Sequence, residues 1–165
     1  MSELLILSDS HGHLDRINEV LARNGARRVI FLGDGIRDID AAEIATREVY
    51  AVRGNCDWCY DMPEEDVEIF DGCRVFFTHG HKYGVKSGLG AALVAAALRD
   101  ADVLLYGHTH RAFEKTYKAG TVLGNGDTLK KPLLVICPGA IGDRPATFAT
   151  LTIAPNGLLA GFGEI

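Results

Sequence analysis

The sequence predicts an α/β protein in which helices cover a sheet-rich core. Apolar runs typical of buried strands alternate with helical segments through the first two thirds of the chain. Several of these runs end in Gly followed by Asp, Asn or His, and the last third is rich in Gly, Thr and Val with turn signals. Layered α/β folds produce this pattern, and 165 residues suit one domain spanning 1–165.

The first part of the chain alternates strands and helices. Continuous apolar runs predict buried strands over 3–8, 28–33 and 48–54. Between them, the segment 14–24 carries apolar residues on one helical face, and 37–46 predicts a shorter helix.

The remaining elements are predicted by turn signals and apolar runs. Strands over 66–70 and 74–80 flank Asp71-Gly72, which is a hairpin signal. An Ala-rich helix follows at about 88–100, and then a strand over 102–107. The segment 112–163 predicts several strands joined by turns, so we expect parallel pairing early and antiparallel pairing late.

Composition excludes several classes of protein. The net charge of −5 argues against general nucleic-acid binding, because phosphate neutralisation requires clustered Lys and Arg. The longest apolar stretch, 89–98, is too short to cross a bilayer, so no membrane interaction is expected. The N-terminus lacks signal-peptide features, and the four cysteines suit free thiols in a reducing compartment. We therefore expect a cytoplasmic protein.

Five apolar strands end in polar residues that can bind a metal. In α/β sheets, ligands bind beyond the carboxyl ends of the strands, so these side chains are expected along one edge of one sheet. The six histidines of the chain all fall in His-x-His pairs at such ends. The candidate ligands are Asp9, His11, Asp34, Asn55, His79, His108 and His110.

The residue types indicate which ions this site would hold. Mixed nitrogen and oxygen ligands without a thiolate suit Mn²⁺, Fe²⁺, Zn²⁺ or Co²⁺. Seven donors exceed the needs of one ion and fit two ions that share a carboxylate. Paired ions can activate a bridging water and clamp the oxygens of an in-line phosphoryl displacement.

The motifs at these strand ends resemble those of the calcineurin-like metallophosphoesterases, specifically the small bacterial and archaeal phosphodiesterase branch. That family carries D-x-H, G-D, G-N-H-[D/E], a lone H and G-H-x-H. Here they stand in the same order, and the strand pattern extends the resemblance over nearly the whole chain. They are "DSH" (9–11), "GD" (33–34), "GNCD" (54–57), "THGH" (78–81) and "GHTH" (107–110).

The resemblance implies a four-layer α/β/β/α sandwich with a dinuclear metal site. It assigns Asp9, His11 and His110 to one ion. It assigns Asn55, His79 and His108 to the other, with Asp34 as the bridge. Mn²⁺ is the favoured metal, with Zn, Fe, Ni or Co as alternatives. The implied reaction is hydrolysis of a small phosphate diester through in-line attack by a metal-bridging hydroxide.

The expected catalytic residues are Asn55, Cys56 and His79. Cys56 departs from the family pattern, which has a His there to contact substrate or protonate the leaving group. A thiol with a pKa near ~8.5 can donate a proton but forms weak hydrogen bonds. The small phosphodiesterase branch of the family often carries this cysteine. His13 or His81 could supply the proton instead.

Other interpretations remain open at this point. Asp9 could be a helix N-cap, Asp34 and Asn55 could be turn residues, and the Cys56–Cys59 pair could be a redox or zinc motif. A small-metabolite phosphomonoesterase is an alternative enzyme. The fold also occurs as a non-catalytic scaffold, the small subunit of the retromer coat, which binds other proteins. A homo-oligomer is also open.

Overall fold

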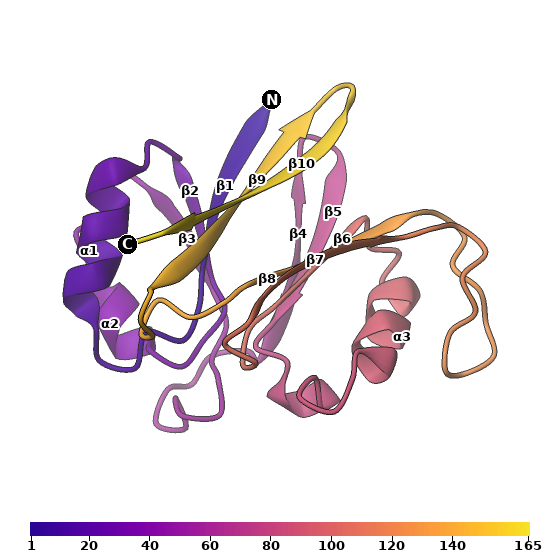
Figure 1. Ribbon diagram of the computed structural model, residues 1–165, viewed down its shortest axis with the longest axis horizontal. Helices are drawn as coiled ribbons and strands as arrows, with labels where there is room; N and C mark the ends of the chain where they lie inside the picture. The colour runs from indigo at the N-terminus through magenta and orange to yellow at the C-terminus, as the bar shows by residue number, and fades with distance from the viewer.

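Two five-stranded sheets pack face to face, with helices on both outer faces (Figure 1). The computed structural model describes all residues, 1–165. The four-layer α/β/β/α architecture implied by the resemblance is confirmed. The expectation that the candidate ligands follow strands of a single sheet is wrong, because those strands divide between the two sheets.

The first sheet has the strand order β10-β9-β1-β2-β3. β1, β2 and β3 are parallel, and β9 and β10 pair antiparallel at one side. The bounds are β1 Ser2–Leu7, β2 Arg28–Phe31, β3 Glu48–Ala51, β9 Thr147–Ala154 and β10 Gly157–Glu164.

The second sheet has the order β4-β5-β6-β8-β7. Its centre is parallel, and its two edge strands are antiparallel. The bounds are β4 Glu65–Phe70, β5 Cys73–Thr78, β6 Val103–Tyr106, β7 Ala112–Tyr117 and β8 Leu133–Pro138. The expected change from parallel to antiparallel pairing along the chain is therefore only partly right, since β4 is antiparallel and β8 is parallel.

Three α-helices cover the outer faces. α1 (Leu14–Arg23) and α2 (Ile36–Ala41) pack on the first sheet, and α3 (Gly90–Leu98) packs on the second. A short 3₁₀ helix, η1, spans His81–Tyr83. No helix has the length and apolar character needed to cross a membrane.

α2 is shorter than the predicted helix over 37–46. It ends at Ala41, and Ala42 has extended backbone angles. The following residues are held by side chains instead of by helical bonds. The Asn18 side chain accepts a bond from the Glu43 N–H, and Arg47 donates to backbone carbonyls at the end of α1. These contacts to α1 replace the missing turn of helix.

The central core lies between the two sheets. Leu4 and Ile6 of β1 face the second sheet, where Val75 and Phe77 of β5 meet them. The alternate residue Leu5 faces α1 on the other side. This burial on both faces explains why β1 reads as an unbroken apolar run. The predicted Asp71-Gly72 hairpin is also present, since Phe70 pairs with Cys73 across it.

Candidate metal centre

The candidate ligands follow the carboxyl ends of strands from both sheets. Asp9 and His11 come after β1, Asp34 after β2, and Asn55 after β3. On the second sheet, His79 follows β5, and His108 and His110 follow β6. The six Asp and His residues of this set form two triplets whose potential ligand atoms lie within 4.8 Å of one another. The triplets are Asp9–His11–His110 and Asp34–His79–His108.

The first triplet surrounds one carboxylate oxygen. Asp9 Oδ1 lies 3.3 Å from His110 Nε2, 3.7 Å from His11 Nε2 and 3.9 Å from His79 Nε2. Asp9 is fully buried, and Oδ1 has no hydrogen-bond partner. An unpaired buried carboxylate oxygen facing imidazole nitrogens is costly unless a cation joins them.

The second triplet is organised around His79, which is fully buried. Its Nδ1 donates to the Leu32 carbonyl oxygen at 2.7 Å, which leaves Nε2 free to act as an acceptor. That Nε2 faces Asp34 Oδ2 at 3.3 Å and His108 Nδ1 at 3.1 Å. A lone pair aimed at a carboxylate and a second imidazole suits a bound cation.

Five of the candidate ligands have left-handed backbone angles. The φ values are +56° for Asp9, +44° for His11, +58° for Asp34, +68° for His108 and +59° for His110. Non-glycine residues seldom adopt this region, although Asp and His do so more readily than most. Clusters of such angles occur where function requires a particular side-chain direction. Here they turn the side chains back toward one point as each strand ends.

Two glycines allow the loops of this site to touch. A Cβ on Gly54 would lie 2.1 Å from Asp34 Oδ1. A Cβ on Gly107 would lie 2.1 Å from the Ser8 Oγ and 2.9 Å from Asp9 Oδ2. The Gly that precedes a ligand in the GN and GH motifs therefore permits close approach of a neighbouring carboxylate.

The remaining carboxylate oxygens are held by hydrogen bonds. Asp9 Oδ2 accepts bonds from the Ser8 hydroxyl and from the His108 N–H, the latter at 3.0 Å. Asp34 Oδ1 accepts a bond from the Cys56 N–H at 2.8 Å. Each carboxylate thus keeps one oxygen fixed and directs the other toward the imidazoles.

Asp57 organises the loops that present Asp34. Its buried carboxylate accepts four backbone N–H bonds, at 2.7, 3.0, 3.1 and 2.8 Å. The donors are Asp34, Gly35, Ile36 and Gly54. The sequence motif contained this residue, but sequence reasoning gave it no role.

Two further carboxylates orient ligands from outside the triplets. Asp38 accepts bonds from the Ser10 hydroxyl and the Gly12 N–H, which hold the loop that carries His11. Asp143 lies 3.1 Å from His110 Nδ1 and so directs His110 Nε2 toward Asp9. Sequence reasoning missed Asp143, which is 33 residues away from His110 in the chain.

The charges in the site shift the pKa values of its members. Burial alone would raise the pKa of Asp34 and lower that of His79. Their mutual interaction and the other polar groups around them together outweigh burial, so the pKa of Asp34 is far below its ordinary value and that of His79 is raised. Burial and the neighbouring His79 lower the pKa of His108 to about 4. His108 is therefore neutral near pH 7 and can donate a lone pair to a metal.

The residues present fit a divalent metal centre. Both triplets combine carboxylate oxygen with imidazole nitrogen, which is the donor set that Mn²⁺, Fe²⁺, Co²⁺ and Zn²⁺ accept. Bound cations would explain why Asp9 Oδ1 has no hydrogen-bond partner. They would also explain why ring nitrogens of His79 and His108 face each other.

Cys56 lies beside the second carboxylate of the site. Its Sγ belongs with His11 and Asp34 to a third group of potential ligand atoms within 4.8 Å. Burial, together with the nearby Asp34 charge, raises the pKa of the Cys56 thiol. Cys56 and Cys59 are both free thiols, so the structure contains no disulfide from the C-x-x-C motif.

A hollow of about 570 Å³ opens next to these residues. Its lining includes His11, Asp34 and Cys56, and it also includes the exposed Arg37 at the start of α2. Most of the lining is polar. A polar molecule is the chemistry that this hollow suits.

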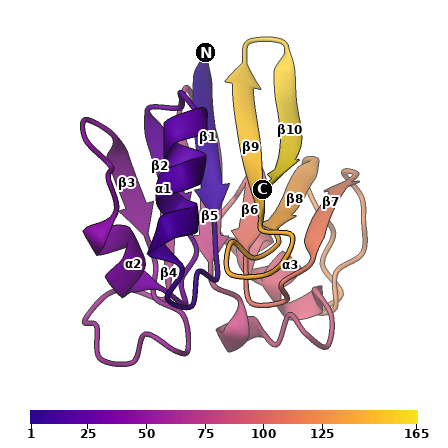
Figure 2. The same cartoon turned by 60° about the vertical axis from the view of Figure 1, so that its left-hand side comes forward.

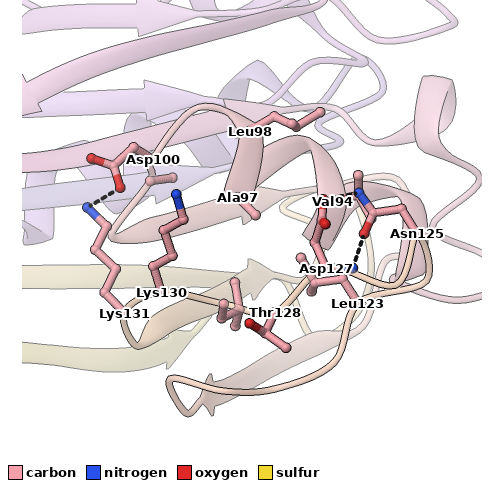
Figure 3. Close-up of a pocket in the computed structure, with 12 residues that line it drawn as sticks. Val94, Ala97, Leu98, Asp100, Leu123, Asn125, Asp127, Thr128, Lys130 and Lys131 are labelled. Atoms are coloured by element: carbon pink, nitrogen blue, oxygen red, sulfur yellow. Dashed lines mark hydrogen bonds and ion pairs between the residues drawn. The ribbon is translucent and has the colours of Figure 1, made fainter.

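A second hollow, of about 530 Å³, lies between α3 and the segment that joins β7 to β8 (Figure 3). Val94, Leu98 and Leu123 give it apolar walls, and Lys131 pairs with Asp100 at its margin. Lys131 precedes β8 and Ala101 precedes β6, so this hollow is at the amino ends of those parallel strands. None of the candidate ligands lines it, and it is separate from the metal centre.

Comparison with known proteins gives the class to which this fold and site belong. The sequence profile of the calcineurin-like phosphoesterase superfamily domain matches residues 2–156. The chain therefore belongs to the calcineurin-like phosphoesterase superfamily, a family of metal-binding hydrolases, as the motifs indicated.

Particular relatives agree with this assignment. The probable metallophosphoesterase YsnB of Bacillus subtilis (strain 168) is 28% identical over 154 residues, which cover 91% of this chain and 83% of that protein. The phosphodiesterase YfcE of Escherichia coli (strain K12) is 35% identical over 137 residues, which cover 67% of this chain and 70% of that protein.

Solved structures share the fold. A predicted phosphoesterase from Streptococcus pneumoniae TIGR4 aligns with a TM-score of 0.77 at 23% identity, covering 99% of this chain and 89% of that chain. Vps29 from Entamoeba histolytica aligns with a TM-score of 0.66 at 20% identity, covering 98% of each chain. At these identities the structural likeness concerns the fold alone.

Proposed function

We propose that the protein is a metal-dependent phosphodiesterase that hydrolyses a small phosphate diester at a dinuclear site. The position of Asp34, which belongs to the second triplet and also faces His11 of the first, carries this proposal. Asp34 Oδ2 lies 3.3 Å from His79 Nε2 and 3.7 Å from His11 Nε2. A carboxylate placed in this way suits a bridge between two ions.

In this proposal Asp9, His11 and His110 hold one ion, and Asn55, His79 and His108 hold the other. Asp34 is shared. Divalent ions so held supply an activated water nucleophile and a clamp on the phosphoryl oxygens of an in-line displacement. Mn²⁺ is the proposed metal. Zn²⁺ is the main alternative, because the Vps29 structure described above is a complex with Zn²⁺.

The chain's own groups position the substrate. The exposed side-chain amide of Asn55 donates a hydrogen bond to a phosphoryl oxygen, and the guanidinium of Arg37 attracts the anionic ester into the polar hollow. The proton for the leaving group comes from water, Cys56 or a neighbouring histidine. Because a thiol with a raised pKa is a reluctant donor, esters with good leaving groups are favoured.

A diester substrate is supported by the relative named phosphodiesterase YfcE. A phosphomonoesterase for a small metabolite is the second candidate enzyme. A protein-binding scaffold is the candidate outside enzymes, and the similarity to Vps29 favours it. The presence of both triplets, together with the unpaired buried oxygen of Asp9 in the first, supports the enzyme instead.

Three features support proposals about the chain as a whole. The two sheets share one inter-sheet core, which supports a single domain over 1–165. All four cysteines are free, which suits the reducing cytoplasm. The acidic net charge of −5 opposes general nucleic-acid binding.

The test compares hydrolysis of bis-p-nitrophenyl phosphate with that of p-nitrophenyl phosphate. The protein is stripped of metal and then given Mn²⁺, with His108→Ala measured in parallel. We expect metal-dependent cleavage of the diester that the variant lacks. Cleavage of the monoester alone would support the phosphomonoesterase, and absence of both Mn²⁺ binding and turnover would support the scaffold.

A further inference from the structure

The two sheets have four edge strands, and three of these carry charged side chains or are short. Charges, proline and short length protect an edge, because its free N–H and C=O groups otherwise pair with another strand. β10 has no such protection from Gly157 to Gly163, where the sequence is GLLAGFG. The charged residues on the other edges are Glu48 on β3, Glu65, Asp66 and Glu68 on β4, and Glu114 and Lys115 on β7.

The hydrogen bonds to β9 show which backbone groups of β10 are free. Ile165 and Ala146 exchange two bonds, at 3.0 and 3.1 Å, and β10 continues in the same register. Such doubly bonded pairs alternate with non-bonded pairs along an antiparallel ladder. The N–H and C=O groups that point away from β9 therefore belong to Leu158, Ala160, Phe162 and Glu164.

Apolar side chains accompany these free backbone groups. Leu159 is 70% exposed and Phe162 is 45% exposed. Phe162 pairs with Ala149, and Ala160 with Leu151, so both lie on the face that continues the inter-sheet core. Figure 2 shows β10 as the outermost strand of its sheet. A strand added beside β10 would extend both the sheet and the margin of that core.

We propose that β10 pairs antiparallel with β10 of a second copy of this chain, forming a two-fold symmetric homodimer. An antiparallel partner of identical sequence offers a matching row of donors and acceptors. The segment from Gly157 to Gly163 is uncharged, so two copies meet there without like-charge repulsion. Self-pairing of β4 would instead bring its three acidic residues close to the same three in the partner.

The topology fixes how the two metal centres lie in this dimer. β10 runs parallel to β1, because both are antiparallel to β9. A two-fold axis through the β10 pair therefore reverses the direction of β1 in the second copy. The two metal centres face opposite ends of a continuous sheet, and each stays open to substrate. The dimer does not depend on the proposed catalytic activity.

Molar mass measured by light scattering after size exclusion tests this proposal on the full chain. We expect twice the 17.8 kDa of one chain for the wild type, decreasing on dilution. Ala160→Pro removes an N–H that points away from β9, so it disturbs only the outer side of the strand. Leu159→Lys places a charge on the same edge without touching the backbone. Both variants should have the monomer molar mass of 17.8 kDa, and their far-UV circular dichroism spectra should match that of the wild type.

Leu98→Lys is the matched control, because Leu98 is 75% exposed on α3, away from β10. It should remain a dimer. A wild type of 17.8 kDa at every concentration overturns the proposal. So does a folded Leu159→Lys that keeps the dimer mass, and this variant decides the question if Ala160→Pro does not fold.

Discussion

Asp34 and His79 meet across the two sheets, with Asp34 Oδ2 lying 3.3 Å from His79 Nε2. Asp34 follows β2 of the first sheet, and His79 follows β5 of the second. The candidate metal centre thus lies where the carboxyl ends of the parallel strands of the two sheets converge. The contact couples the packing of the sheets to the chemistry of the site.

Asp34→Asn should remove nearly all phosphodiesterase activity, by about 10³-fold or more. The variant keeps the shape of the side chain but loses the negative charge that faces His79 and His11. Steady-state hydrolysis of the diester and Mn²⁺ binding by calorimetry measure the effect. Asp40→Asn, at an exposed position of α2, is the matched control and should behave as wild type. Turnover by Asp34→Asn at the wild-type rate would contradict the bridging role.

Asp143→Ala should weaken binding of one metal ion by about 10–100-fold, because Asp143 fixes the orientation of His110. The loss should appear as a higher Mn²⁺ concentration for half-maximal activity, with the maximal rate restored at saturation. Asp143→Asn should be milder, since its amide oxygen can still accept a hydrogen bond from Nδ1. An Asp143→Ala protein with wild-type Mn²⁺ affinity would exclude this positioning role.

Asp57→Asn should destabilise the metal-free protein by about 3 kcal/mol, because a buried carboxylate that accepts four backbone bonds is lost. The amide can accept at one oxygen only, and its NH₂ group faces N–H donors. Urea unfolding followed by circular dichroism gives the free energy of unfolding. Asp61→Asn, exposed in the same loop, should change it little. Equal stability of both variants would refute the structural role of Asp57.

The metal-free protein should lose stability as pH rises above about 6.5. The nearby Asp9 carboxylate raises the pKa of His11, and the Asp34 and Asp9 carboxylates raise that of His79 despite its burial. When the pKa of a group is higher in the folded protein than in the unfolded chain, its protonation stabilises the folded state. This contribution is complete at pH values below the unfolded pKa, and it is lost as pH rises through the folded pKa. His108, with a pKa near 4, titrates below this range.

Metal should reverse this pH trend, because protons and metal ions compete for the same nitrogens. We expect Tm of the metal-free protein to fall across this range and Tm of the Mn²⁺-loaded protein to rise or stay level. Thermal unfolding followed by fluorescence of the single Trp measures both. A metal-free protein whose Tm increases with pH would show that the histidines are not paired with these carboxylates.

The sequence allowed most of the candidate centre to be predicted, because each ligand comes shortly after a strand that the sequence marks as an apolar run. Apolar runs and the residues after them are local features. The division into two sheets is not local, since it depends on whether β3 pairs with β4 or ends its sheet. Neither residue composition nor alternation encodes that choice.

Contacts between segments that are distant in the chain could not be predicted from the sequence either. Asp143 reaches His110 only because the loop after β8 packs on the loop after β1, where the Ile141 N–H donates to the Ser8 carbonyl oxygen at 2.9 Å. α2 ends early because the chain that follows it is bound to α1: the Glu43 N–H donates to Asn18, and the Arg47 side chain donates to the Leu21 carbonyl oxygen. Both outcomes depend on tertiary contacts that periodicity does not reveal.

The number of metal ions required for turnover decides whether the site is dinuclear. Metal-free protein is titrated with Mn²⁺, and bound metal and diester hydrolysis are measured on the same samples. A dinuclear site predicts that two ions bind per chain and that hydrolysis appears only as the second ion binds. Full activity with a single bound ion, or hydrolysis that is independent of metal, would contradict it.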